Sequence, residues 1–454
     1  MKALFVIAIA VLLVFSSTAA IAQWEFVRAY TPYHAPSKPD NLWGIHGVAV
    51  DPDGKIWVCP YEATDTLTIG PGTNDARREI FVFNPDGTPA AFSPVKEIEV
   101  GGVIDSLNNN NSSRGIATDQ EGNILYSSFN RVFRIDYKTG LGLGKIDEAQ
   151  TGSITKAATD DNGYVFVGRV INGGFPIRIF NPDLSFLANA VDTLQTGGTI
   201  ARTLAVSGDG TRFYFPAIYS TPNKKTYVFE NLFGPGFGQY TLVDSFFIGM
   251  QAESMGWQPR PGGSPILWAS AGSMENPPDS MWQESVWYGL DPATGNVIDS
   301  IEWGVTFPGN PTFDDTVANA QRRRPRGIAF TSTGDTAYVC MFLADSNSVK
   351  MFRKTATSVE PVAGTVPEEY TLSQNYPNPF NPTTEIQFSI PTAGLTTLVV
   401  YDMLGREVVT LVNDNLTPGS YKTTFNAASV SSGTYLYILT SNGYRVSKKM
   451  MLIK

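Results

Sequence analysis

Short apolar runs alternate with turns rich in Asp, Asn and Gly between residues 24 and 353 of the chain. Six segments repeat one pattern, in which small apolar residues precede such a turn and a second apolar run follows it. The first repeat places residues 47–50 before the turn at 51–54 and residues 56–58 after it. The later repeats start at Gly115, Ala157, Leu204, Met255 and Gly327. Because Asp, Asn and Gly favour tight turns, each repeat predicts an antiparallel pair of strands.

Two further strands follow most of these pairs, for example at residues 80–83, 131–136, 177–180 and 286–290. Repeats at intervals of about 45 residues, with four strands in each, are typical of a β-propeller. We therefore predict an all-β chain with a six-bladed β-propeller at residues 23–353. The alternative is a seventh blade inside one of the two longer gaps between repeats.

The sixth repeat ends with its third strand, residues 349–352, and a segment with little apolar periodicity follows. We expect the N-terminal strand, residues 24–28, to supply the missing outer strand and to close the ring without an exposed edge. The small residues of each first strand suit an inner ring, where the strands lie close to one another.

The end of the chain, residues 370–454, has a different pattern of apolar and polar alternation. Residues 385–390, 398–401 and 433–439 alternate with period two, and turns interrupt them. This pattern predicts a small immunoglobulin-like β-sandwich. The segment before it, residues 354–369, contains Pro361, Gly364 and Pro367 and is predicted to be a linker.

The motifs of residues 370–454 point to export. The segment opens with Tyr376-Pro377-Asn378-Pro379-Phe380-Asn381-Pro382, contains Gly405-Arg406 and Ser432-Gly433-Thr434-Tyr435, and closes on the basic and apolar residues 448–454. In these it resembles the type A C-terminal sorting domain of proteins exported by the type IX secretion system. The resemblance implies partnership with that machinery, passage through the periplasm and the outer membrane, removal of the domain, and release or attachment at the cell surface. The alternative is an accessory domain with no export role.

The start of the chain agrees with export. Lys2 precedes the apolar run of residues 3–15, and Ala20-Ile21-Ala22 forms a cleavage signal. We predict a signal peptide at residues 1–22, with an uncleaved anchor as the alternative. No later stretch reaches eighteen apolar residues, so we expect a soluble mature protein without a stable transmembrane segment.

Composition narrows the classes of function. The formal net charge is −9, which argues against nucleic-acid binding, because that needs a basic surface. The two cysteines, Cys59 and Cys340, each follow an aromatic residue and a valine. We therefore expect them at equivalent positions of two repeats, as buried thiols or as a disulfide.

Propellers bind ligands where the loops entering the innermost strands converge. The residues just before each inner strand would form a ring there, and they are His46, Arg114, Thr155, Arg202, Glu253 and Arg326. Because guanidinium groups bind carboxylate and phosphate in a bidentate manner, this ring predicts an anionic or polar ligand. A uronate, a phosphate or a peptide carboxylate would fit. The alternative is that these side chains bond only to loop carbonyls and to one another.

The repeat core, as in Gly115-Ile116-Ala117 with Asp119 and Gly122-Asn123, resembles six-bladed NHL and lactonase-like propellers. The resemblance implies, for an enzyme, a divalent cation held by carboxylates near the channel, for which Glu253 and Glu62 are candidates. The spacing does not supply three convergent oxygen ligands, so no cofactor and no metal site is predicted, with calcium in the Asp-rich turns as the alternative.

Other chemistry is restricted by residue counts. With only two histidines, His34 and His46, a Ser-His-Asp triad must use one of them, and no G-x-S-x-G motif is present. A lyase based on His46 is an open alternative. Trp282, Trp287 and Trp303 are candidates for stacking on sugar rings.

These observations favour a binding or scaffold module at the cell surface or outside the cell. Its ligand would be an anionic small molecule, a glycan or a protein. Whether the protein is an enzyme stays open, and the alternative function is an extracellular lactonase-like hydrolase or lyase that acts on a carbohydrate or a lactone.

Overall fold

The computed structural model describes residues 24–30, 44–61, 65–70, 73–107, 112–147, 152–170, 176–192, 200–217, 224–260, 263–272, 278–284, 286–302, 324–342, 349–354, 360–362, 367–403, 405, 407–427, 430 and 432–453. The chain divides into two compact units. One is Trp24–Lys354, and the other contains Thr355–Lys454. The predicted signal peptide lies outside the described residues.

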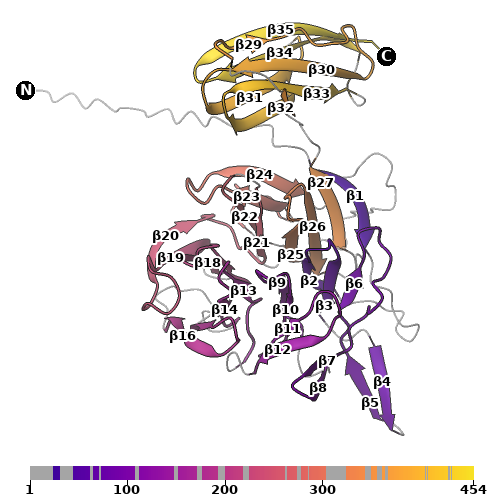
Figure 1. The fold of residues 1–454 in the computed structure, drawn as a ribbon, viewed down its shortest axis with the longest axis vertical. Coiled ribbons are helices and arrows are strands. Elements are labelled where there is room, and N and C mark those ends of the chain that lie inside the picture. The colour runs from indigo at the N-terminus through magenta and orange to yellow at the C-terminus, as the bar shows by residue number, and fades with distance from the viewer. Residues whose placement is uncertain are drawn as a thin grey trace, which may run out of the picture. The chain divides into compact units, whose positions relative to one another are not determined.

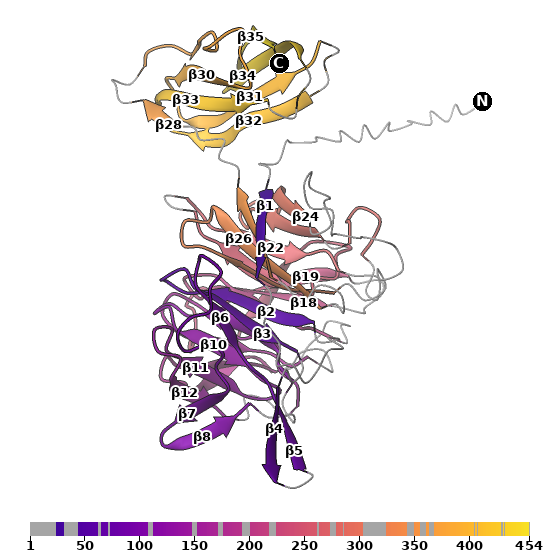
Figure 2. The same cartoon turned by 90° about the vertical axis from the view of Figure 1, so that its right-hand side faces the viewer.

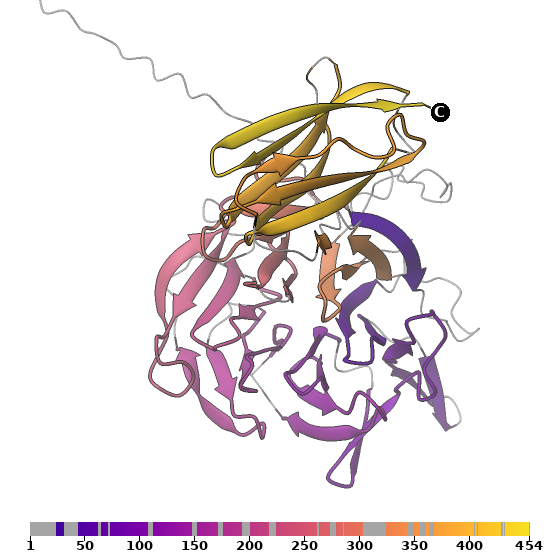
Figure 3. The same cartoon turned by 45° about the horizontal axis from the view of Figure 1, so that its top comes forward.

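The first unit is a six-bladed β-propeller, as predicted, and Figure 3 shows its blades arranged in a ring. Six sheets of the described residues form the blades. The first holds β2 (Ile45–Val50), β3 (Ile56–Pro60) and β6 (Phe81–Phe83), and the second holds β9 (Gly115–Thr118), β10 (Ile124–Ser127), β11 (Val132–Ile135) and β12 (Gly142–Ile146). The third holds β13 (Ala158–Thr159), β14 (Val165–Val167), β15 (Ile177–Phe180) and β16 (Phe186–Val191).

The fourth blade holds β17 (Ala205–Val206), β18 (Arg212–Ala217), β19 (Lys225–Glu230) and β20 (Thr241–Phe246). The fifth holds β21 (Met255–Gln258), β22 (Ile266–Ser270), β23 (Val286–Leu290) and β24 (Val297–Glu302). The sixth holds β25 (Arg324–Phe330), β26 (Thr336–Phe342), β27 (Val349–Lys354) and β1 (Trp24–Tyr30). All neighbouring strands within these sheets pair antiparallel.

The first blade departs from the regular plan. Its sheet has three strands, and a hairpin of β4 (Asp65–Gly70) and β5 (Thr73–Arg77) is inserted between β3 and β6. This hairpin projects from the propeller in Figures 1 and 2. A second hairpin, β7 (Glu97–Val100) and β8 (Val103–Ser106), precedes the second blade. These insertions account for the first of the two longer gaps between repeats.

The N-terminal strand closes the ring, as the sequence predicts. β1 pairs antiparallel with β27, from Trp24 opposite Lys354 to Tyr30 opposite Val349. Trp24 is buried and packs edge-on against Trp268, with ring centroids 5.9 Å apart. Its indole nitrogen donates a hydrogen bond of 3.1 Å to Asp299. The chain ends of the propeller are therefore joined both by a strand ladder and by side-chain packing.

Glycines allow the inner strands to approach one another. A Cβ atom on Gly47 would lie 2.8 Å from the backbone nitrogen of Ile116, and one on Gly327 would lie 3.0 Å from that of Val48. Such separations are too short for carbon, so a side chain is excluded at these positions. The expectation that small residues serve a crowded inner ring is confirmed.

The two cysteines occupy equivalent positions, as predicted. Cys59 is opposite Gly47 in the first blade, and Cys340 is opposite Gly327 in the sixth. Both are buried free thiols rather than a disulfide. Burial raises the pKa of Cys59 to about 12, so both sulfurs stay protonated near neutral pH.

The second unit is a β-sandwich of two four-stranded sheets. One sheet has the order β28 (Glu360–Val362), β33 (Gly419–Asn426), β30 (Thr383–Ile390), β29 (Thr371–Leu372). The other has the order β32 (Glu407–Leu416), β31 (Gly394–Tyr401), β34 (Gly433–Ser441), β35 (Tyr444–Leu452). Alternate residues of β30 and β34 are buried between the sheets. Residues 360–362, expected in the linker, instead pair with β33.

No helix of the described residues is long and apolar enough to cross a membrane.

Candidate functional site

The six residues expected at the channel mouth hold the same place in every blade. Each lies one or two residues before the first residue of its blade that lines the central channel. Together they are called the mouth cluster: His46, Arg114, Thr155, Arg202, Glu253 and Arg326. The charges of Arg114, Arg202 and Arg326 all act on the imidazole of His46. Side chains from four blades therefore share one region at this end of the channel.

Glu253 neutralises part of this positive charge. Its side chain is fully buried, and its carboxylate accepts a hydrogen bond from Nη1 of Arg326. The same carboxylate oxygen lies 3.7 Å from Nε of Arg202. The described side chains of the mouth cluster therefore hold one carboxylate against three guanidinium groups. For Glu253, this pairing agrees with the alternative interpretation of the sequence, in which the side chains of the ring bond to one another.

Arg114 has a different environment from the other two arginines. Its guanidinium carbon lies 5.6 Å from the ring centre of Tyr61 and 5.4 Å from that of Phe129. No carboxylate of the described residues forms an ion pair with it. Burial raises the pKa of Tyr61, but a hydrogen bond from Arg114 and the charge of Arg114 outweigh burial and lower it. Arg114 is thus held between aromatic rings with its positive charge uncompensated by an anion.

His46 is a buried, neutral member of the cluster. Its ring centre lies 5.0 Å from that of Tyr61 and 6.3 Å from that of Phe342. Burial lowers the pKa of His46 well below its usual value, and the charges of Arg326, Arg114 and Arg202 lower it further. Nδ1 of this imidazole has no hydrogen-bond partner among the described residues. His46 is therefore an uncharged, buried side chain with an unpaired ring nitrogen.

Thr155 plays a local part in its blade. The residue is fully buried, and its hydroxyl oxygen accepts a hydrogen bond of 3.0 Å from the backbone nitrogen of Gly168.

The prediction that Trp287 stacks on a sugar ring is wrong. Its side chain is fully buried, and its indole nitrogen donates a hydrogen bond of 2.9 Å to the hydroxyl oxygen of Ser254. Trp282 is half-buried against Tyr288, with ring centres 5.1 Å apart. Trp303, Glu62 and His34 lie outside the described residues.

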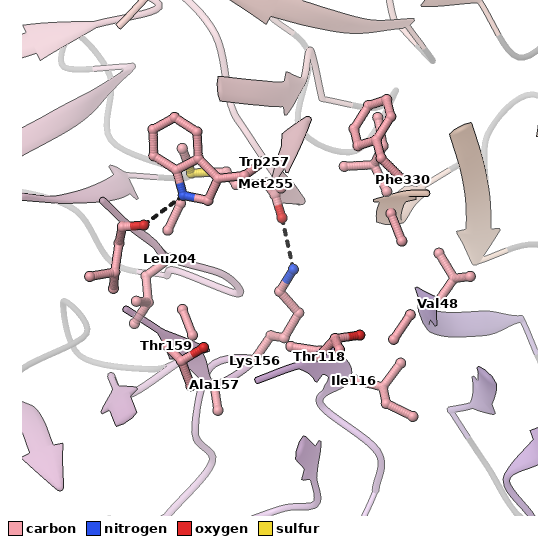
Figure 4. Close-up of a pocket in the computed structure, with 18 of the residues that line it drawn as sticks. Val48, Ile116, Thr118, Lys156, Ala157, Thr159, Leu204, Met255, Trp257 and Phe330 are labelled. Atoms are coloured by element: carbon pink, nitrogen blue, oxygen red, sulfur yellow. Dashed lines mark hydrogen bonds between the residues drawn. The ribbon is translucent and has the colours of Figure 1, made fainter. Parts of the chain in front are cut away.

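Below the mouth cluster, the inner strands of all six blades enclose a cavity of about 200 Å³, called the channel cavity. Figure 4 shows Lys156 reaching across it, and Nζ of this side chain donates a hydrogen bond of 2.7 Å to the carbonyl oxygen of Met255. Burial lowers the pKa of Lys156 to about 8. Sequence reasoning missed Lys156, although the signal was present. It aligns with Gly47, Gly115, Thr203, Ser254 and Gly327, which are all small.

The Asp side chains of the Asp-rich turns bond to nearby protein groups and stabilise the turns. Asp51 accepts hydrogen bonds from the Lys55 backbone and the Trp57 indole, at 2.9 Å each. Asp119 accepts from the backbone of Asn123 at 2.8 Å and pairs with Arg134 at 3.0 Å. Burial raises the pKa of both carboxyl groups. Within the described ranges, no group of three or more His, Cys, Asp or Glu side chains is placed to hold a metal ion.

Comparison with known proteins identifies the end of the chain. Residues 374–454 match the family model described as the secretion system C-terminal sorting domain. No curated protein matches the sequence.

Several solved structures are similar to the chain. PorZ of Porphyromonas gingivalis, described as a surface component of the type-IX secretion system, is 14% identical over 90% of this chain and 51% of its own, with a TM-score of 0.38. The chain thus spans about half the length of PorZ. The WD40 β-propeller domain of Doa1 is 10% identical over 73% of this chain and 97% of its own, with a TM-score of 0.41.

The extracellular domain of BT4673 from B. thetaiotaomicron is 12% identical over 95% of this chain and 60% of its own, with a TM-score of 0.40. The match at residues 374–454 confirms the resemblance drawn from the sequence motifs. The chain therefore carries a type IX sorting domain that follows a six-bladed propeller in the sequence. It is exported to the cell surface or the extracellular space.

Proposed function

We propose that the exported propeller is a binding module whose mouth cluster binds an anionic group, such as the carboxylate of a uronate or a peptide, or a phosphate. The environment of Arg114 carries this proposal. Its guanidinium group is held between Tyr61 and Phe129 and has no ion-pair partner among the described residues. A desolvated charge without a counter-ion is unfavourable, so an anionic ligand would stabilise this arrangement.

The rest of the mouth cluster supports the same proposal. Arg202 and Arg326 share Glu253, so the described cluster keeps an excess of positive charge. Nδ1 of the neutral His46 adds a position for a hydrogen bond. The planar guanidinium of Arg114 can bind a planar anion such as a carboxylate through two parallel hydrogen bonds.

The test is a titration of the purified full chain with glucuronate, with inorganic phosphate, and with a dipeptide and its C-terminal amide. We expect one of the anions to bind, and Arg114→Met to weaken that binding by about tenfold or more. The control is Arg353→Met, because Arg353 is exposed on β27, and this variant should bind as the parent does. Absence of binding by all the anions, or equal binding by the Arg114 variant, would refute the proposal.

We also propose that this binding needs no cofactor. Dialysis against a chelator should then leave anion binding and the melting temperature unchanged. A rise in melting temperature on adding calcium would instead support the alternative of a divalent cation in the Asp-rich turns, since a bound ion stabilises the folded state.

A second candidate function is a lyase acting on a uronate-containing carbohydrate. The observation that favours it is the position of Tyr61, whose pKa is lowered beside Arg114 and whose ring lies against His46. β-Elimination requires a base near a cation that neutralises the substrate carboxylate, and these three residues provide both. Formation of an unsaturated sugar by the parent chain, lost in Tyr61→Phe, would establish the lyase.

A further inference from the structure

The channel cavity is a site distinct from the mouth cluster, and its walls combine apolar side chains with polar groups, among them the hydroxyls of Thr118 and Thr159. Val48, Ile116, Leu204, Met255, Trp257 and Phe330 all line it, together with small residues of the inner strands. The Trp257 indole donates a hydrogen bond of 2.6 Å to the carbonyl oxygen of Val206, which fixes that ring against the wall (Figure 4). The cavity is smaller than the pockets that hold drug-sized ligands, so only a short molecule would fit.

Of the described residues that line the cavity, Lys156 is the one with a titratable side chain. It stands on the third blade, and its Nζ reaches Met255 on the fifth blade. At the aligned position of the other blades, the side chain is absent or small. Its long side chain therefore crosses a channel that the remaining blades leave open, at the end where the mouth cluster lies.

The charge of Lys156 is not balanced within the described part of the chain. An ammonium group has three hydrogen-bond donors, and the Met255 carbonyl accepts one of them. No carboxylate of the described residues forms an ion pair with it. The sulfurs of Cys59 and Cys340 act on it electrostatically, but burial keeps both thiols protonated and therefore neutral. The ammonium group in this cavity thus lacks an anionic partner among the described residues.

We propose that the channel cavity binds a small monocarboxylate with an apolar body, its carboxylate on Nζ of Lys156 and its body against Trp257, Leu204 and Phe330. A single cation matches one negative charge, whereas a phosphate dianion would leave charge uncompensated. The site goes beyond the proposed function, because it uses none of the residues of the mouth cluster. Either proposal, for the channel cavity or for the mouth cluster, can therefore be refuted while the other holds.

The experiment is calorimetric titration of the full chain with hexanoate and phenylacetate, and with hexanamide as an uncharged ligand of the same shape. We expect saturable binding of one carboxylate per chain, and binding of the amide weaker by about tenfold or more, since it lacks the charge. Lys156→Met should weaken the binding of the carboxylate by the same factor of about tenfold or more. The control is Lys138→Met, because Lys138 is exposed on the second blade, and this variant should bind hexanoate as the parent does.

A measurement on the unmodified chain covers the case in which Lys156→Met does not fold. Lysine side chains are acylated with a soluble reagent, and the modified positions are quantified by mass spectrometry with and without hexanoate. We expect hexanoate, but not hexanamide, to protect Lys156 at least about tenfold more than Lys138. Equal labelling with and without hexanoate, or equal affinity of the Lys156 variant, would overturn the proposal.

Discussion

Glu253 allows two arginines to occupy a buried space near the channel mouth. The side chain of Arg326 is 2% exposed and that of Glu253 is fully buried. Glu253→Gln keeps the shape but removes the negative charge, so we expect it to lower the free energy of unfolding by about 3–5 kcal/mol. Urea denaturation measures this. The matched control is Glu230→Gln, because the pair of Glu230 with Arg212 is partly exposed and should contribute at most about 1 kcal/mol. Equal effects of the two substitutions would contradict the role given to Glu253.

His46 makes stability depend on pH. In the folded chain its pKa lies well below 6.5, so the imidazole stays neutral, while the unfolded chain takes up a proton as the pH falls through about 6.5. The unfolded state therefore binds more protons at low pH, and stability decreases on acidification. Between pH 7 and pH 5 this contribution should reach roughly 2 kcal/mol.

We expect His46→Gln to remove this component. The comparison is the change in the free energy of unfolding from pH 7 to pH 5, in the parent and in the variant. Asp51, Asp119 and Asp160, which burial also perturbs, titrate in both proteins and cancel in the difference. Identical pH profiles would show that the pKa of His46 is the same in the folded and the unfolded chain, which would contradict its predicted lowering.

The positions of the mouth cluster were predictable because they lie at a fixed offset from a repeated inner strand. Their pairing was not, since sequence spacing does not give the distance between Glu253 and Arg326 across two blades. Tyr61 and Phe129, whose rings lie near the Arg114 guanidinium, follow second strands and belong to no repeated motif. Lys156 could have been found, because one long side chain breaks a column of small ones.

Trp24 is a large buried side chain that helps β1 to close the propeller. Trp24 is 5% exposed and contacts Trp268 and Phe330, with centroid distances of 5.9 Å to each ring. We expect Trp24→Ala to lower the free energy of unfolding by about 3–5 kcal/mol, through lost burial and the cavity that remains. Thermal or urea denaturation of the full chain measures the loss.

A second substitution in the same strand serves as the control. Val27 is 41% exposed, so Val27→Ala should change stability by no more than about 0.5 kcal/mol. If Trp24→Ala were as mild as Val27→Ala, packing of β1 would not hold the ring closed.

The inner strands of the blades were predictable, whereas several outer elements were not. Inner strands are buried, as in β2 and β3, so their apolar runs stand out in the sequence. The outer strand β20 is exposed over its first four residues, so it lacks that signal. The strand β28 was missed for another reason. It is three residues long and contains Pro361, and its pairing with β33 depends on a partner about sixty residues away in sequence.

Passage from the periplasm to the outside should depend on the sorting domain, whereas folding of the propeller should not, because the propeller closes on its own strands. The ladder between β1 and β27 completes the sixth blade without any strand of the second unit. A chain that ends before residue 374 should therefore fold its propeller but stay in the periplasm of a host with the type IX machinery. Cell fractionation with detection of the propeller measures this.

The control is the full chain with Arg114→Met, which alters the mouth cluster and leaves residues 374–454 intact. It should reach the cell surface or the medium in the same amount as the parent. Mass spectrometry of the exported parent should also find Gln23 at its N-terminus, as cleavage after Ala22 requires. Export of the truncated chain would mean that a signal in the propeller suffices, and the sorting role of residues 374–454 would then be redundant.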